Sequence, residues 1–302
     1  MALVLDQLGK GAHVGIVRLR SLGDCVLTTP AIRLLKRHRP DLRIGVVTEP
    51  RFAGVFDGNP DIDDILDPSP KALHRFSPRL CLNLHGGTRS LVLTLLSGAR
   101  YRAGFRHYRF SSLYNVRIPR AQEILRVNRK VHTAEHLASA MFYLGVPRTE
   151  IPRANLHVRP MRSNSHYAVI HALASAPDKT WPAERFREVA EYVRQHMDLE
   201  PVFLGAPGED LSAFQPYRAH VGSLDDTKRL LNGASLFIGN DSGPAHMAAA
   251  FGLPVIVLFA ASDPVVWAPW QTISEQIIAT EGMSAISVKR VVKALERLRV
   301  KA

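Results

Sequence analysis

The residues best placed for chemistry follow a buried apolar run, Leu236 to Gly239, and lead directly into a helix start at Pro244. They are Asp241, Ser242, Gly243 and His246. Backbone amides at Ser242 and Gly243 would be free at the positive end of the helix dipole, which favours phosphate. Asp241 and His246 could add contacts to a ribose or a phosphate. The alternative is that Asp241 or Ser242 only caps the helix.

The elements that must position these groups alternate between strands and helices. In the first half, strands are predicted over residues 14–20, 44–47 and 80–84, with a turn at 21–24, a helix through Lys36 and a second helix over 135–144. In the second half, strands are predicted over 167–171, 201–205, 236–239 and 255–259, with helices beginning at Pro182, over 225–232 and over 288–300. Such alternation indicates parallel sheets with helices on their faces.

The chain length and a linker suggest two domains. A chain of 302 residues fits two domains of about 150 residues each, and the Pro/Arg-rich segment 151–162 reads as the linker. We therefore expect domains over 1–160 and 161–302, each a doubly wound α/β fold.

Positive charge is concentrated in the first domain. Residues 1–160 hold 25 Lys and Arg against 12 Asp and Glu, whereas 161–302 hold 14 against 15. A basic face attracts nucleic acid, an anionic membrane surface or a polyanionic substrate. No nucleic-acid-binding motif accompanies the charge, so we do not expect nucleic acid as a partner.

Other features favour a cytoplasmic protein. No apolar run is long enough to span a bilayer, and the first thirteen residues lack the apolar core of a signal peptide. Cys25 and Cys81 have no metal or disulfide spacing, so we expect both in the core.

Four segments in this order resemble the glycosyltransferase family 9 heptosyltransferases. They are Arg20-Ser21-Leu22-Gly23-Asp24, Gly58-Asn59-Pro60-Asp61-Ile62-Asp63, Lys179-Thr180-Trp181-Pro182 and the block from Asn240 to Pro254. The resemblance covers nearly the whole chain. It implies the GT-B architecture, two facing Rossmann-like domains with the site in the cleft, and a final helix, 288–300, that packs back towards the first domain.

The resemblance also implies an inverting transfer of heptose from ADP-heptose to the lipopolysaccharide core. Asp24 matches the catalytic aspartate and would act as the base, although it could instead cap a helix. Lys179, with Thr180 beside it, matches the phosphate lysine. Glu209 matches a residue that holds the donor ribose, and Gly222 and Leu224 belong to a segment that borders the adenine.

A lysine and a helix N-terminus could neutralise the leaving diphosphate, and no Asp-X-Asp pair is present, so we expect a reaction without a metal or other cofactor. The acceptor domain would bind an acidic or phosphorylated glycolipid at the inner membrane face. Guanidinium groups pair well with such anions, and the candidates are Arg20, Arg51, Arg100, Arg102, Arg106 and Arg109. His85 could face the same site or be structural.

The chain departs from the family pattern at three points. Ala172-Leu173-Ala174 follows His171 where Pro-Gly is usual, Ala260 replaces a glycine after Phe259, and Asn83 stands where aspartate is common. Two other functions therefore stay open: a nucleotide-sugar epimerase on the same fold, and a nucleotide-sugar-binding protein with weak catalysis. A dinucleotide dehydrogenase is disfavoured because no Gly-X-Gly-X-X-Gly turn follows the first strand.

Overall fold

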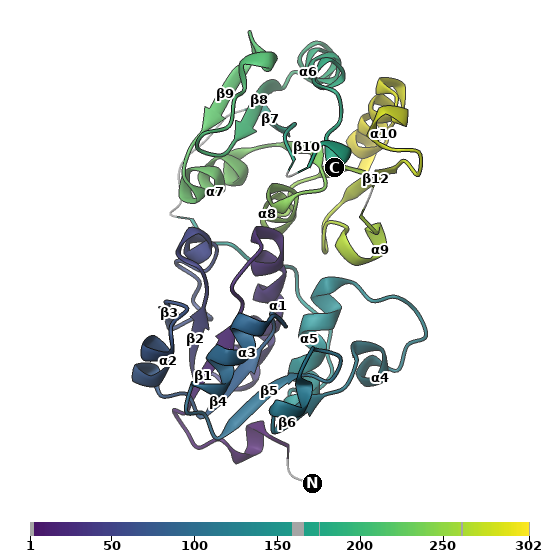
Figure 1. Ribbon diagram of the computed structural model, residues 1–302. Coiled ribbons are helices and arrows are strands. Elements are labelled where there is room, and N and C mark those ends of the chain that lie inside the picture. The colour runs from purple at the N-terminus through teal and green to yellow at the C-terminus, as the bar shows by residue number, and fades with distance from the viewer. Residues whose placement is uncertain (1–2, 159–165, 175, 261, 302) are drawn as a thin grey trace. The chain divides into compact units, whose positions relative to one another are not determined.

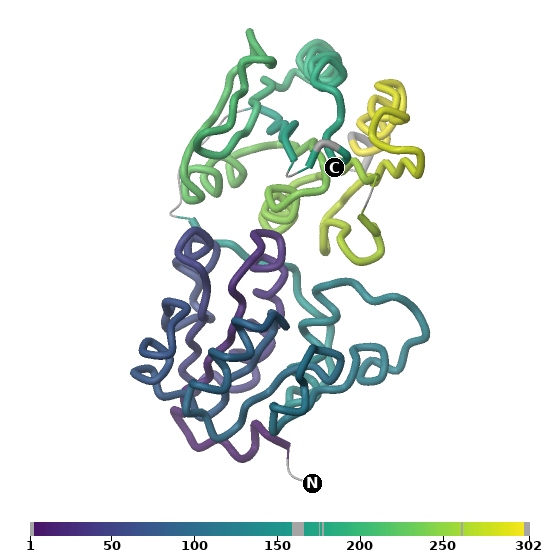
Figure 2. Tube along the Cα trace, viewed as in Figure 1, coloured from purple at the N-terminus to yellow at the C-terminus, as the bar shows by residue number. Residues whose placement is uncertain are grey.

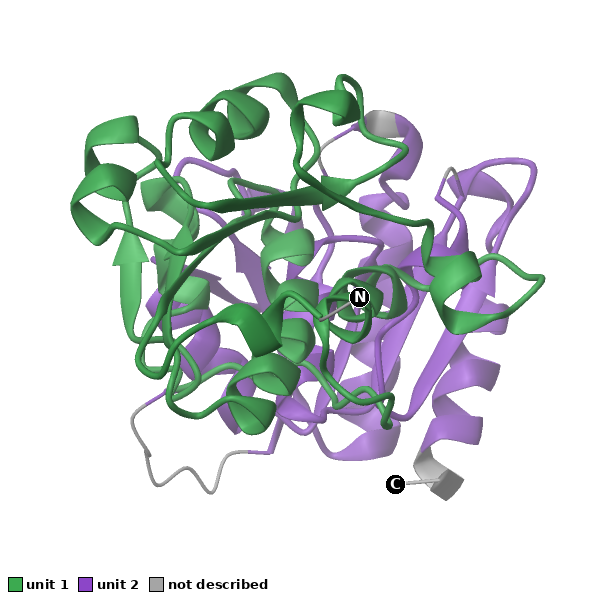
Figure 3. Ribbon diagram, turned by 90° about the horizontal axis from the view of Figure 1, so that it is seen from below, with its two compact units in different colours: residues 1–157 green, residues 158–302 purple. Residues whose placement is uncertain are grey.

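A computed structural model describes the chain except residues 1–2, 159–165, 175, 261 and 302. The chain forms two compact units, Met1–His157 and Val158–Ala302, which Figure 3 colours separately. Each unit contains one six-stranded sheet with helices on it (Figure 1). The predicted class, two doubly wound α/β domains, is confirmed. Residues 159–162 of the linker predicted over 151–162 lie outside the described residues, and residues 151–158 form no helix or strand.

The elements of the first unit are η1 Leu5–Gln7, β1 His13–Val17, α1 Leu22–His38, β2 Arg43–Val47, η2 Pro50–Val55, β3 Asp64–Leu66, α2 Pro70–Phe76, β4 Leu80–Asn83, α3 Thr88–Leu95, β5 Tyr101–Phe105, η3 Ser111–Leu113, β6 Val116–Ile118, α4 Ala121–Leu125 and α5 Thr133–Leu144. The sheet order is β3-β2-β1-β4-β5-β6, with every neighbouring pair parallel. The order reverses between β1 and β4. At such a reversal, loops from neighbouring strands diverge and leave room for a ligand at the carboxyl edge.

The elements of the second unit are β7 Tyr167–His171, η4 Pro177–Lys179, α6 Ala183–Met197, β8 Glu200–Gly205, η5 Ser212–Phe214, β9 Arg218–Val221, α7 Leu224–Gly233, β10 Leu236–Asn240, α8 Gly243–Phe251, β11 Val255–Phe259, α9 Pro264–Trp267, β12 Ser274–Ile278, η6 Met283–Ala285 and α10 Val288–Lys301. The order β12-β11-β10-β7-β8-β9 is again parallel throughout and reverses between β7 and β10.

The core of each unit explains why these strands form. Strands β1, β4, β7, β10 and β11 are buried over nearly their whole length, as expected for parallel strands covered on both faces. Cys25 and Cys81 are buried, as predicted. Trp181, Phe186 and Val189 pack in the core of the second unit.

The last helix has partners inside its own unit. α10 packs against α6, β11 and β12, and the tube trace in Figure 2 shows it at the yellow end of the chain. Its apolar residues Val291, Leu295 and Leu298 are buried in the same core. Contact between this helix and the first unit stays a prediction. Of the helices described, none combines the length and apolar character needed to cross a membrane.

Candidate functional site

Asp24 lies in the first turn of α1, at the carboxyl edge of β1. The sequence placed it in a turn before the helix, which is wrong, because the helix begins at Leu22 and Ser21 is its N-cap. The Ser21 backbone N–H and Oγ donate to Asp24 Oδ2 at 3.3 and 3.0 Å. Asp24 therefore helps to cap the helix from its third position, although it is not the N-cap residue.

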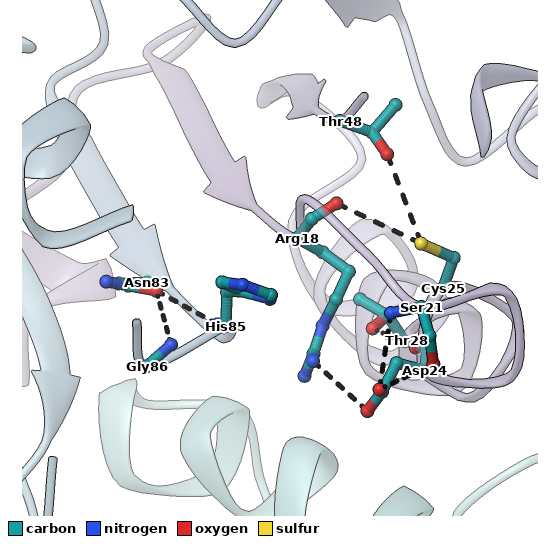
Figure 4. Close-up of polar contacts among 9 residues, drawn as sticks. All are labelled: Arg18, Ser21, Asp24, Cys25, Thr28, Thr48, Asn83, His85 and Gly86. Atoms are coloured by element: carbon teal, nitrogen blue, oxygen red, sulfur yellow. Dashed lines mark hydrogen bonds and ion pairs between the residues drawn. The ribbon is translucent and has the colours of Figure 1, made fainter. Parts of the chain in front are cut away.

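The other carboxylate oxygen of Asp24 meets an arginine. Arg18 follows β1 directly and is nearly buried, and its Nη1 lies 3.2 Å from Asp24 Oδ1. Figure 4 shows the guanidinium pointing at the carboxylate. The Asp24 side chain keeps 23% of its surface exposed. The residue thus has a fixed orientation and an accessible side, which a general base requires.

Two neutral side chains, His85 and Tyr108, lie within reach of the charges of this ion pair. Burial, together with the Arg18 charge, lowers the pKa of His85 below its usual value. Burial also raises the pKa of Tyr108, whose hydroxyl is sensitive to the charges of both Arg18 and Asp24. His85 is therefore neutral near pH 7 and lies close to Arg18 on the loop that follows β4 (Figure 4).

Asn83 explains one departure from the family pattern. Its Oδ1 accepts from the backbone N–H groups of His85 and Gly86 at 2.9 and 3.0 Å. Its Nδ2 donates to Ser90 Oγ at 3.0 Å and to the Tyr114 hydroxyl at 2.8 Å. Ser90 Oγ donates its own proton to the Gly87 carbonyl at 2.7 Å and can only accept from residue 83, so an amide suits this neighbour and a carboxylate would not.

The predicted acceptor arginines lie at separate places on the first unit. Arg20 is exposed just before α1. Arg51 pairs with Glu49 at 3.0 Å. Arg106 and Arg109 share the loop after β5, where Arg106 lies 3.9 Å from Glu123 and Arg109 stacks on the Phe110 ring at 4.8 Å. Of these four arginines, only Arg106 and Arg109 lie in the same loop. The two other candidates are Arg100, which stacks on Tyr101, and Arg102, which donates to the Ala99 carbonyl.

In the second unit, Asn240 organises the edge where the strand order reverses. This buried residue ends β10; its Nδ2 donates to the Ala172 carbonyl at 2.8 Å and its Oδ1 accepts from Trp181 N at 3.2 Å. It therefore ties the loops after β7 and before α6 to β10. Gly239 allows the close approach, since a Cβ there would lie 2.8 Å from the His171 carbonyl oxygen.

Ser242 is the N-cap residue of α8, but its hydroxyl makes no capping bond to that helix. Instead its Oγ lies 3.2 Å from His171 Nδ1. Burial lowers the pKa of His171 to about 4, so the ring is neutral near pH 7. The amides at the start of α8 thus remain without a side-chain cap from Ser242, which leaves them available to an anion. The helix begins at Gly243, one residue before the predicted start at Pro244, and it ends at Phe251 with Gly252 as its C-cap, which agrees with the predicted stop.

Lys179, Ser262 and Asp241 come together beside this helix start. Lys179 Nζ lies 3.1 Å from Ser262 Oγ. Burial raises the pKa of Asp241, while a hydrogen bond from Ser262 and the Lys179 charge act in the opposite direction. Sequence reasoning missed Ser262; its only signal was its position just after β11, the strand beside β10.

The remaining donor candidates take part in local turns. Thr180 Oγ1 donates to the Ala176 carbonyl at 2.9 Å and so fixes the Lys179 turn. Glu209 is exposed and accepts from Ala206 N at 2.7 Å. Gly222 and Leu224 flank Ser223, which caps α7. His246 is buried in α8, with its ring 6.3 Å from that of Trp267. Helix α6 begins at Ala183 rather than at Pro182, which is its N-cap.

Within the described ranges, no three His, Cys, Asp or Glu side chains gather as metal ligands would.

The sequence matches the family described as glycosyltransferase family 9 (heptosyltransferase) over residues 71–294. The chain belongs to this family. Its members are glycosyltransferases, so the predicted enzyme class is confirmed, and the resemblance found in the sequence motifs was correct.

Similar proteins agree with membership of glycosyltransferase family 9. Lipopolysaccharide heptosyltransferase 3 of Escherichia coli strain K12 is 27% identical, with 83% of each chain covered. A solved family 9 glycosyl transferase from Veillonella parvula has a TM-score of 0.84 at 22% identity, covering 97% of this chain and 98% of its own. The E. coli heptosyltransferase WaaC with ADP has a TM-score of 0.79 at 20% identity, covering 95% and 99%. These structures establish the GT-B fold.

Proposed function

We propose that this glycosyltransferase moves heptose from ADP-heptose to an acidic lipopolysaccharide-core acceptor, with inversion and without a divalent metal. The observation that carries the proposal is the uncapped start of α8 beside Lys179 and Asp241, which suits a diphosphate. Family membership and the printed names of the relatives, among them a heptosyltransferase with ADP, support the choice of donor.

The first unit would activate the acceptor. Asp24 takes the proton from the attacking hydroxyl, and that oxygen forms a bond to the anomeric carbon on the face opposite the leaving group. The bond between the anomeric carbon and the diphosphate oxygen breaks, and its electron pair leaves with ADP. A single displacement of this kind inverts the configuration.

The second unit would stabilise the leaving group. The backbone amides of Ser242 and Gly243 and the Lys179 ammonium would bind the diphosphate and stabilise the negative charge that develops on it. Glu209, Gly222 and Leu224 would border the ribose and adenine, with Thr180, Asp241 and His246 supporting them. Arg20, Arg51, Arg106 and Arg109 would bind the acidic acceptor, in the cytoplasm at the inner face of the membrane. Under this proposal, residues 1–160 bind the acceptor and 161–302 bind the donor.

The test is calorimetric titration of ADP, UDP and GDP with EDTA present. ADP-selective binding that is weakened by Lys179→Ala and by Asp241→Ala, but not by the exposed control Lys289→Ala, is expected. Preference for UDP or GDP would overturn the ADP-heptose assignment. Consumption of ADP-heptose without an acceptor would favour the epimerase, and binding without any turnover would favour a binding protein.

A further inference from the structure

The loop after β5, Arg106–Leu113, exposes apolar and basic side chains together. Phe110 and Leu113 are each 50% exposed, and Arg106 and Arg109 are exposed beside them. A single exposed apolar residue is ordinary on a protein surface. Two exposed apolar residues within one short basic loop indicate a surface that binds a partner.

The loop presents these side chains from a fixed backbone. Ser111 Oγ donates to the Arg106 carbonyl at 2.7 Å, and Ser111 N donates to the Tyr108 carbonyl at 3.1 Å. Phe110 has a positive φ of 59°, and the Arg109 guanidinium covers its ring at 4.8 Å. The backbone of the loop therefore keeps the Phe110 ring at the surface, where the Arg109 guanidinium stacks on it.

The chain segment that holds the loop is strongly basic. Residues 100–122 hold six arginines and neither aspartate nor glutamate. Arg106 lies 3.9 Å from Glu123, and both of these side chains are more than half exposed. An exposed pair at that distance neutralises little of the local field. The loop thus suits a partner that is anionic and also accepts apolar side chains.

The loop is anchored next to Asp24. Tyr108 packs against Gly86, where an added Cβ would lie 2.7 Å from the ring, and its hydroxyl is sensitive to the charges of Arg18 and Asp24. Phe110 follows two residues later. The exposed apolar side chains therefore belong to the same edge of the sheet as the proposed base.

We propose that the Arg106–Leu113 loop docks on an anionic phospholipid surface. Phe110 and Leu113 enter the boundary between headgroups and acyl chains, while Arg106 and Arg109 pair with the phosphates of that surface, those of the lipid-linked acceptor included. The inference rests on the proposed function in one respect: a lipid-linked acceptor would lie at that surface, next to Asp24.

The test is co-sedimentation of the whole chain with vesicles of equimolar phosphatidylglycerol and phosphatidylcholine, compared with pure phosphatidylcholine. The double variant Phe110→Ser/Leu113→Ser should lower the vesicle-bound partition by about tenfold, and high salt should release the wild type. The matched control is Val221→Ser/Val265→Ser in the second unit, where the side chains are 49% and 52% exposed. This control should bind like the wild type.

A second readout guards against unfolding of the loop variant. Phe110→Trp should give a blue shift in fluorescence on anionic vesicles, whereas Val221→Trp should not shift. Equal binding to both vesicle types, unchanged binding of the double serine variant, or no shift for Phe110→Trp would each overturn the proposal.

Titration of ADP separates this inference from the proposed function. Phe110→Ser/Leu113→Ser should bind ADP like the wild type, because neither residue belongs to the proposed donor site. Wild-type protein that binds anionic vesicles through the loop but does not bind ADP would overturn the heptosyltransferase proposal alone. Protein that binds ADP but not vesicles would overturn the docking proposal alone.

Discussion

Arg18 Nη1 lies 3.2 Å from Asp24 Oδ1, while Ser21 holds the other oxygen of the same carboxylate. The arginine is nearly buried and comes from the end of β1, so its position is set by the sheet. The carboxylate comes from the helix that follows. The pair therefore fixes the proposed base between two rigid elements.

Arg18→Met should lower kcat by about 10- to 100-fold and leave ADP binding unchanged, because it frees the carboxylate and alters no residue of the proposed donor site. Asp24→Asn alone should cost about 10²- to 10⁴-fold. Steady-state kinetics with a saturating acceptor would measure both.

A double-mutant cycle distinguishes positioning from a separate role of Arg18. If Arg18 acts through Asp24, Arg18→Met should have no further effect in the Asp24→Asn background. Arg18→Lys should recover part of the rate, since it keeps the charge. Additive losses would show that Arg18 contributes independently of the base.

Ser262→Ala should weaken ADP binding by about three- to tenfold, because the serine joins Lys179 to Asp241 and its loss frees the ammonium. The effect on AMP should be smaller, since AMP lacks the β-phosphate. Calorimetry on both nucleotides measures the difference, with the exposed Ser284→Ala as control. Equal losses for AMP and ADP would argue against an effect at the diphosphate.

Most inner strands were predicted from the sequence, whereas the inner strand β5 and the edge strands β3, β6, β9 and β12 were not. β1, β4, β7 and β11 are continuous apolar runs because both faces are covered. The edge strand β9, Arg218–Val221, has exposed or half-exposed residues throughout, and β3 has no fully buried residue. A strand with one neighbour need not be apolar, so its composition does not distinguish it from a loop.

The candidate site likewise contains residues that the sequence could propose and residues that it could not. Asp24, Lys179 and the Ser242-Gly243 turn belong to short motifs, so the sequence alone could propose them as candidates. Ser262 contacts Lys179 only because β11 lies beside β10, and the Asn83 contact to Tyr114 depends on the packing of a later loop. Such pairs are set by strand order and tertiary packing, which local patterns do not encode.

His136 should make the first unit less stable in mild acid. Its ring stacks on Phe105 at 4.0 Å, and burial lowers its pKa from 6.5 to about 4. His136 binds a proton less readily in the folded state than in the unfolded chain. The free energy of unfolding is therefore highest above about pH 6.5 and decreases as the pH falls towards 4. By pH 5 the loss from this one residue should be about 2 kcal/mol.

Urea unfolding at pH 7 and pH 5 measures this loss. His136→Phe, which keeps the ring stacking, should reduce the fall in unfolding free energy, whereas His38→Phe at an exposed site should not change it. An identical fall in the wild type and in His136→Phe would show that other groups cause the acid sensitivity.

Gly239→Ala should disturb the donor site and the second unit together. The new Cβ would lie 2.8 Å from the His171 carbonyl oxygen, a backbone atom that cannot rotate away, so β7 and β10 must separate. Crowding of this kind costs about 1–3 kcal/mol. His171 contacts Ser242, and the displacement should therefore also weaken ADP binding.

Gly9→Ala is the matched control, because an added Cβ there meets no atom within 4 Å. Thermal melting and ADP titration of the two variants check the prediction, and unchanged binding by a destabilised Gly239→Ala protein would show that the His171–Ser242 contact does not shape the donor site.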